Sequence, residues 1–163
     1  MAPLASFAVM YRPAKNKVFD ALAYHYRKNL YAKIIARHDL RGMLTWLKAN
    51  QVIWYTPDVD AGTKNSVFVP FFGVPAASIT ATTRLADMTQ AAVMPIFFYR
   101  RDDFSGYDIC IEPMLENFPS GNIEHDTLRI NQIIETAVRK KPEEYLWQYK
   151  RFKTRPNNEK RFY

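Results

Sequence analysis

Residues 54–62 read Trp-Tyr-Thr-Pro-Asp-Val-Asp-Ala-Gly, and residues 66–73 read Ser-Val-Phe-Val-Pro-Phe-Phe-Gly. An apolar run therefore stops at a proline, two carboxylates follow it two residues apart, and a second apolar run stops at a glycine. A strand, an acidic loop and a second strand are typical of an α/β sheet that presents polar groups at a strand end, where ligands commonly bind. This stretch predicts an α/β protein with a polar site at the acidic loop.

The size and composition of the chain favour one folded domain. Its 163 residues suffice for a hydrophobic core. A hydrophobic content of 48% and an aromatic content of 15% argue for a globule and against disorder. We expect a single domain over residues 1–163, with residues 150–163 as a basic tail.

The formal charge of +7 is unevenly distributed along the chain. Residues 12–48 carry a net charge of +7, residues 49–138 a net charge of −6, and residues 139–163 a net charge of +6. Two basic segments thus flank an acidic middle. Basic surfaces attract phosphates, anionic lipids or acidic proteins, and charge alone does not choose among these partners.

Cysteine content and hydropathy exclude several classes of protein. Cys110 is the single cysteine, so the chain has neither an internal disulfide nor a multi-cysteine metal site, and a small buried strand side chain is favoured over a reactive thiol. No apolar run approaches the roughly 18 residues of a membrane span. The apolar start, residues 1–10, lacks the basic region and long hydrophobic stretch of a signal peptide, and we interpret it as a buried strand.

The hydrophobic pattern predicts a mixed β-sheet flanked by helices. Strands are expected at residues 6–11, 51–56, 67–72, 91–99 and 107–112. Helices are expected at residues 15–31, 40–49, 75–90 and 125–140, with a short helical turn after Pro142. Residues 91–99 form a continuous apolar run, typical of a strand covered on both faces, and its return through residues 107–112 would make a hairpin.

Apolar spacing assigns inward faces to three of these helices. In the first helix Val18, Leu22, Tyr26 and Leu30 recur every four residues and form one stripe, near which His25 is expected to be packed. Asp39 is the expected N-cap of the second helix. The second and fourth helices are expected to bury the following apolar residues: Leu40, Met43, Leu44 and Leu47, and Ile130, Ile133, Ile134, Ala137 and Val138.

Three residues are candidates for ligand binding. Arg12 stands where a strand meets a proline, so its guanidinium could fork onto a phosphate or carboxylate; the alternative is a surface salt bridge. Asp58 and Asp60 could orient a basic group, accept ligand hydroxyls or bind a metal through oxygen ligands. The alternative for this pair is turn chemistry, in which an aspartate bonds nearby backbone N–H groups.

Other polar residues are weaker candidates. His25, His38 and His125 are not favoured as catalytic residues, because the aspartates that directly follow His38 and His125 would not face them on a helix. Residues 151–155 are basic with an aromatic inside, a pattern that could stack on single-stranded nucleic acid, although a solvated basic tail is favoured. We expect no metal site and no nucleic-acid partner.

The motifs of the chain resemble those of the late acyltransferases of lipid A biosynthesis, the lauroyl and myristoyl transferases of the Gram-negative inner membrane. They include Tyr-Arg-Pro at residues 11–13, Asp-Leu-Arg-Gly-Met at residues 39–43 and the stretches at residues 53–62 and 66–73. They continue with Ala-Thr-Thr-Arg-Leu-Ala at residues 81–86, Glu-Tyr-Leu-Trp at residues 144–147 and Arg-Phe-Lys-Thr-Arg-Pro at residues 151–156. Because they occur in order over nearly the whole chain, they are more specific together than any one alone.

The resemblance implies transfer of a fatty acyl chain from acyl carrier protein to a hydroxyl of a phosphorylated glucosamine lipid. In this family a histidine and an acidic residue separated from it by four residues form the catalytic motif, with the histidine as general base. The residues five positions after His25, His38 and His125 are leucine, methionine and isoleucine. We therefore expect a glycerolipid-acyltransferase-like fold that is incomplete at its N-terminal side, with no catalytic residue in this chain.

The resemblance also implies roles for the candidate residues. Arg12 would contact the anionic head group or its phosphate, and Asp58, with Asp60 beside it, would shape the acceptor site. The implied partners are acyl carrier protein, a lipid A precursor and the anionic surface of the inner membrane, met peripherally from the cytoplasmic face. No cofactor is implied.

Two other functions stay open on the sequence. One is a non-catalytic module that binds anionic lipid or acyl carrier protein. The other is a basic protein that binds nucleic acid through its tail. A chain lacking part of its fold would also leave an exposed apolar face or an open sheet edge, both of which promote aggregation.

Overall fold

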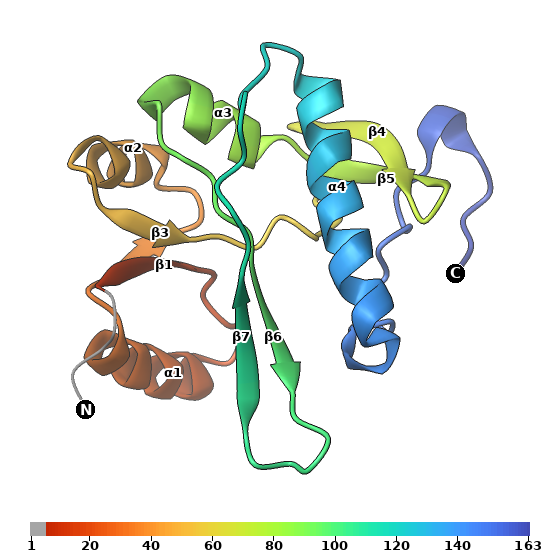
Figure 1. The fold of residues 1–163 in the computed structure, drawn as a ribbon. Coiled ribbons are helices and arrows are strands. Elements are labelled where there is room, and N and C mark those ends of the chain that lie inside the picture. Colours follow the sequence, from red (N-terminus) through yellow and green to blue (C-terminus); the bar gives the residue numbers. More distant parts are fainter. Residues whose placement is uncertain (1–5) are drawn as a thin grey trace. The chain divides into compact units, whose positions relative to one another are not determined.

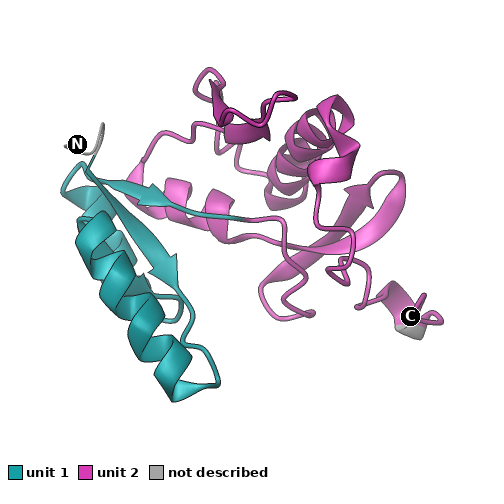
Figure 2. Cartoon of the chain, turned by 90° about the horizontal axis from the view of Figure 1, so that it is seen from below, with its two compact units in different colours: residues 1–56 teal, residues 57–163 magenta. Residues whose placement is uncertain are grey.

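The computed structural model describes residues 6–163, and the chain divides into two compact units at Thr56 and Pro57 (Figure 2). Both units combine helices with strands, which confirms the α/β class and the flanking helices. The expected single mixed sheet does not form among the described residues, because the strands divide into one parallel sheet and two antiparallel hairpins. The expected strand at residues 1–10 falls partly on residues 1–5, which lie outside the described residues.

Unit 1 is a three-stranded parallel sheet with the strand order β2-β1-β3. Its elements, in chain order, are β1 (Phe7–Tyr11), α1 (Lys17–Leu30), β2 (Lys33–Ala36), α2 (Leu40–Lys48) and β3 (Val52–Trp54). The chain places β2 on one side of β1 and then crosses over to place β3 on the other side. Since crossovers between parallel strands are right-handed, this reversal places α1 and α2 on opposite faces of the sheet, as Figure 1 shows.

The apolar stripe of α1 is exposed, which corrects the expectation of a buried face. Val18 is 81% exposed and Leu30 is 66% exposed, and Leu22 and Tyr26 are exposed as well. His25, expected to be packed, is also exposed. The helix itself forms as expected, with Asn16 as N-cap.

The other side of α1 makes the contacts with the sheet. The Tyr11 hydroxyl donates to the Asp20 carboxylate, the Arg27 guanidinium lies 5.2 Å from the centre of the Tyr11 ring, and the Tyr24 ring meets the same ring edge-on. Polar and aromatic groups therefore fix the rotation of the helix. The apolar spacing correctly groups these residues on one side of α1. The expectation that this side faces the sheet is wrong, because it faces solvent.

The expected N-cap of α2 is confirmed. The Asp39 carboxylate accepts the backbone N–H of Gly42 at 2.8 Å. A Cβ at residue 42 would collide with the Asp39 carboxylate, so the glycine leaves room for the cap. Met43 is buried as expected, whereas Leu40 is exposed and Leu44 and Leu47 are half-buried.

Unit 2 contains two antiparallel hairpins and a long helix. Its elements are β4 (Ser66–Phe71), β5 (Val74–Ile79), α3 (Ala81–Thr89), β6 (Ile96–Arg100), β7 (Tyr107–Ile111), α4 (Ile123–Lys140) and the 3₁₀ turns η1 (Pro142–Glu144) and η2 (Pro156–Asn158). The expected β6–β7 hairpin and the turn after Pro142 are confirmed. In Figure 1, α4 lies across the β4–β5 hairpin.

The start of the expected helix at residues 75–90 is wrong, because residues 74–79 form β5. Phe72 and Gly73 both have positive φ, 50° and 76°, and they join β4 to β5 as a two-residue hairpin loop. Such turns match the twist of the flanking strands and are usually built from Asn-Gly or Gly-Gly. Phenylalanine in the first position gave no such signal, and the helix begins only at Ala81.

The strand expected at residues 91–99 is shorter and more exposed than expected. It begins at Ile96, and the hairpin turns one face outward, where Ile109 and Ile111 of β7 are exposed. Cys110, on the other face, is half-buried. This hairpin is therefore an outer layer and not a central strand pair.

The long helix α4 buries polar residues in addition to the expected Ala137 and Val138. The Asn131 amide donates to the carbonyl of Pro70 and to the Ser78 hydroxyl, both at 2.9 Å. The Glu135 carboxylate accepts the N–H of Phe72 at 2.8 Å. These bonds fix the β4–β5 hairpin to the helix, while Ile130, Ile133 and Ile134 are only half-buried.

None of the helices within residues 6–163 combines the length and the apolar character needed to cross a membrane.

Candidate functional site

The carboxyl end of the parallel sheet in unit 1 carries two arginines. Arg12 follows β1 and Arg37 follows β2, and both are exposed. Tyr11 and Ala36 pair across the two strands, and the Arg37 N–H donates to the Tyr11 carbonyl at 2.9 Å. The ladder thus brings two arginines to the same edge, the edge at which parallel sheets commonly bind ligands.

Arg37 was missed by the sequence analysis because β2 was missed. Four residues, Lys-Ile-Ile-Ala, make a strand too short to show alternation between two expected helices. The local signal for β2 is the run Ile34–Ala36, which Arg37 follows two residues before the helix cap Asp39. The same arrangement of strand, arginine and helix occurs at Arg12.

The acidic groups nearest this edge are bound to the protein itself. Asp20 accepts the Ala14 N–H at 2.7 Å and the Tyr11 hydroxyl. The Tyr11 hydrogen bond is the main cause that lowers the pKa of Asp20, and the same bond raises the pKa of Tyr11. Asp39 is engaged as the cap of α2. Among the residues that the structure describes, no ion pair holds either arginine.

The second expected region is the acidic loop in unit 2, where Asp60 is 2% exposed. Its carboxylate accepts the N–H of Gly62 at 2.9 Å and the N–H and hydroxyl of Thr154, each at 2.8 Å. The Gly62 bond is the turn chemistry weighed as the alternative for this pair. The Thr154 bonds fasten the loop to the C-terminal segment, 94 residues away along the chain.

Asp58 lies in the same loop and is half-buried. Its charge adds to burial in raising the pKa of Tyr145 to about 12. Burial lowers the pKa of Arg151, while Tyr145, Asp60 and Asp58 oppose that shift. Asp58 therefore lies near Tyr145 and Arg151, and it is the more accessible of the two aspartates.

Two arginines of the C-terminal segment are fixed to the protein, which corrects the expectation of a solvated basic tail in part, since residues 159–163 are exposed. Arg151 is 2% exposed and donates to the Ala77 carbonyl at 3.0 Å and to the Ser78 hydroxyl at 2.7 Å. Arg155 donates to the Pro75 carbonyl and to Glu159, each at 2.7 Å. Arg151 is thus unavailable to an external ligand.

The histidines do not form a catalytic relay in the described residues. His125 Nδ1 lies 3.4 Å from the Ser120 hydroxyl and 3.7 Å from the Asp126 carboxylate. A relay needs the serine and the acid on different ring nitrogens, and here both face the same one. No group of three histidine, cysteine or acidic residues that could hold a metal occurs among residues 6–163.

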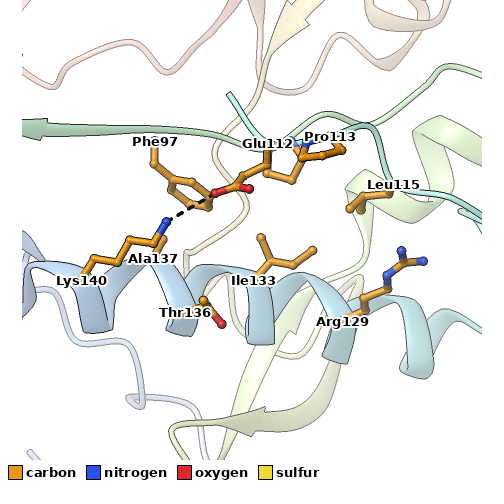
Figure 3. Close-up of a pocket in the computed structure, with 10 residues that line it drawn as sticks. Phe97, Glu112, Pro113, Leu115, Arg129, Ile133, Thr136, Ala137 and Lys140 are labelled. Carbon is orange, nitrogen blue, oxygen red and sulfur yellow. Dashed lines mark ion pairs between the residues drawn. The ribbon is translucent and has the colours of Figure 1, made fainter. Parts of the chain in front are cut away.

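A groove runs along α4 within unit 2 (Figure 3). Its volume is about 340 Å³, at the lower end of ligand pockets. Its apolar lining includes Phe97, Leu115 and Ile133. The Glu112–Lys140 ion pair, 3.6 Å long, and Arg129 lie at its two ends.

The structure brings some expected site residues together and separates others by unit. Asp58 and Asp60 share one loop in unit 2, whereas Arg12 belongs to unit 1. None of the three lines the groove along α4. Convergence of Arg12 with the two aspartates stays a prediction.

Comparison with known proteins gives one consistent result. The sequence model of the family described as bacterial lipid A biosynthesis acyltransferase matches residues 3–154. The chain is 36% identical over 154 residues to the lipid A biosynthesis palmitoleoyltransferase of Escherichia coli K12, covering 94% of this chain and 50% of that protein. It is 38% identical over 148 residues to the lipid A biosynthesis lauroyltransferase of the same organism, covering 90% and 48%. A lipid A biosynthesis acyltransferase of Haemophilus influenzae is 37% identical over 150 residues, covering 91% and 48%. The chain spans about half the length of these relatives.

Proposed function

The chain belongs to the bacterial lipid A biosynthesis acyltransferase family, and from that premise we propose that it supplies the acceptor-binding part of such an enzyme. The proposed reaction transfers a fatty acyl chain from acyl carrier protein to a hydroxyl of a phosphorylated glucosamine lipid. The main support for the proposal is the match of the family's sequence model to residues 3–154. The similar proteins named as palmitoleoyltransferase and lauroyltransferase support it as well.

Arg12 is proposed to bind the phosphate of the acceptor. Its guanidinium is exposed at the carboxyl end of β1, and no described residue forms an ion pair with it. A guanidinium presents parallel N–H donors that match two phosphate oxygens. Because Arg12 forms no ion pair with a described residue, it can bind a phosphate without first breaking a salt bridge.

Asp58 and Asp60 are proposed to form the sugar side of the acceptor site, with different tasks. Asp60, whose oxygens are filled by backbone and Thr154 donors, contributes by holding the loop. Asp58, half-buried, has oxygens that can accept hydroxyl or amide protons of a glucosamine.

The reaction needs a general base that this chain does not contain in the expected form. An alcohol attacks a thioester readily only when a positioned group takes its proton. The family motif pairs a histidine with an acid separated by four residues, and none of the three histidines here has that partner. We therefore propose that the 163 residues alone give no acyl transfer.

The proposed place of action is the cytoplasmic face of the inner membrane, with peripheral contact by these residues. The basic residues 12–48 suit both an anionic lipid surface and an acidic carrier protein. The same observation favours a second candidate function, a non-catalytic module that binds anionic lipid or carrier protein. Salt-sensitive sedimentation with anionic vesicles, with no turnover in any context, would favour that second function.

A chimera tests the proposal. Residues 3–154 of this chain replace the matching stretch of the Escherichia coli palmitoleoyltransferase, which restores the catalytic motif. We expect acyl transfer by the chimera and none by the 163-residue chain, and we expect Arg12→Ala and Asp58→Ala in the chimera each to lower the rate strongly. Lys48→Ala, an exposed charge at the end of α2, is the control. Turnover by the chain alone, or full rates in both site variants, would contradict the assignment.

A further inference from the structure

Two successive strands of unit 1 end in the same way. Each of β1 and β2 is followed directly by an exposed arginine and then by the N-terminus of a helix, α1 after Arg12 and α2 after Arg37. Helix N-termini carry a partial positive charge and favour anions. The repetition places two arginines along one edge of a three-stranded sheet, while the helix N-termini are capped by Asn16 and Asp39.

The backbone ladder fixes the two arginines as neighbours. Tyr11 and Ala36, the last residues of the two strands, pair across the ladder, and the Arg37 N–H donates to the Tyr11 carbonyl at 2.9 Å. Adjacent strands are about 4.8 Å apart, and each arginine follows this last pair by one residue. Both guanidiniums can therefore reach one group with the size of a phosphate.

The oxygens of the two aspartates near this edge accept hydrogen bonds from other groups, although both side chains keep their negative charge. Asp20 is bonded to Tyr11 and Ala14, and Asp39 is bonded to the N–H of Gly42. The described part of the chain shows no ion pair for Arg12 or Arg37. Two like charges close together, neither of them in an ion pair, are an arrangement that a dianion stabilises.

We propose that Arg37, together with Arg12, binds one phosphate monoester at the carboxyl end of β1 and β2. Arg37 is a binding residue in this assignment, and the ligand class is a sugar phosphate dianion. The identification of that phosphate with the acceptor of acyl transfer rests on the proposed function. The two-arginine anion site itself rests on the sheet.

A binding experiment on the 163-residue chain separates these claims. Inorganic phosphate, glucosamine 1-phosphate and uncharged N-acetylglucosamine are titrated separately, and dissociation constants are read from amide chemical shifts by nuclear magnetic resonance. We expect both phosphates to bind and the uncharged sugar not to bind. Tighter binding of the sugar phosphate would identify the natural source, and equal binding would restrict the site to the phosphate group alone.

Variants test the pairing of the arginines. Arg37→Ala should weaken phosphate binding by about 10- to 100-fold, the range for a charge-assisted hydrogen bond, and Arg37→Lys should recover part of the loss. Lys48→Ala, which removes an equal exposed charge from the C-terminal end of α2, is the matched control and should change binding less than about 2-fold. The effect of Arg37→Ala should shrink in an Arg12→Ala background, because the two side chains share one ligand.

Three results would overturn the inference. They are unchanged binding in Arg37→Ala, an equal loss in Lys48→Ala, or independent effects of the two site arginines. All three would leave the proposed function standing if the chimera still transfers acyl chains. Conversely, an inactive chimera with intact two-arginine binding would remove the acyl-transfer proposal and keep the anion site.

Discussion

Asp60→Ala should destabilise unit 2 far more than its place in a loop suggests. The carboxylate is 2% exposed and accepts three hydrogen bonds, one from Gly62 and two from Thr154. Each lost bond to a charged group costs about 1 kcal/mol or more when the donor is partly shielded from water. The buried Arg151 also loses one of the neighbouring charges that stabilise its charged form. Together these losses amount to about 3–5 kcal/mol.

Urea unfolding with hydrogen exchange of the α4 amides measures this loss, because exchange reports on unit 2 separately. Asp60→Asn should lose less than the alanine variant, since the amide keeps one acceptor oxygen. Asp58→Ala is the control from the same loop and should lose under about 1 kcal/mol, because Asp58 is only half-buried. A loss below about 1 kcal/mol in Asp60→Ala would refute the view that this carboxylate fastens the loop to the C-terminal segment.

Three further predictions concern unit 1. Asp39→Ala should lower stability by about 1 kcal/mol through loss of the α2 cap, as thermal unfolding would show, and an unchanged midpoint would contradict the cap. Leu22→Glu on the exposed arc of α1 should reduce aggregation measured by light scattering, whereas Ala21→Glu, about 100° around the helix, should not; equal effects would make net charge the cause. Because the pKa of Asp20 is lowered in the folded protein, its contribution to stability is present above the unfolded value near 3.8 and is lost as pH falls through the folded value. Asp20→Asn should therefore flatten the acid limb of the stability–pH curve, and an unaltered limb would argue against that contribution.

The sequence predicted best those elements whose signal is local. The N-cap of α2 needed only an aspartate before an apolar periodic segment, and the β6–β7 hairpin needed two apolar runs around a polar turn. Both follow from the chemistry of a few adjacent residues. The alternation of predicted helices and strands along the chain indicated the α/β class.

The misses come from tertiary contacts or from short elements. The rotation of α1 depends on Tyr11 meeting Asp20 and Arg27, contacts that no periodicity contains. The β4–β5 turn places Phe72 at positive φ, which residue preference argues against. Buried Asn131 and Glu135 look like surface positions until the hairpin edge that they bind is known.

The candidate site shows the same division. Arg12 was identified from a strand that meets a proline, a local signal. Arg37 depended on β2 and its register with β1, which a four-residue strand does not reveal. The role of Asp60 depended on Thr154, which lies 94 residues further along the chain.

The most direct test of the central claim is the Michaelis constant of the acceptor in the chimera that carries Arg12→Ala. If residue 12 binds the acceptor phosphate, this constant should rise by about 10- to 100-fold while the constant for the acyl carrier protein donor stays the same. An unchanged acceptor constant, or an equal rise for both substrates, would contradict the account.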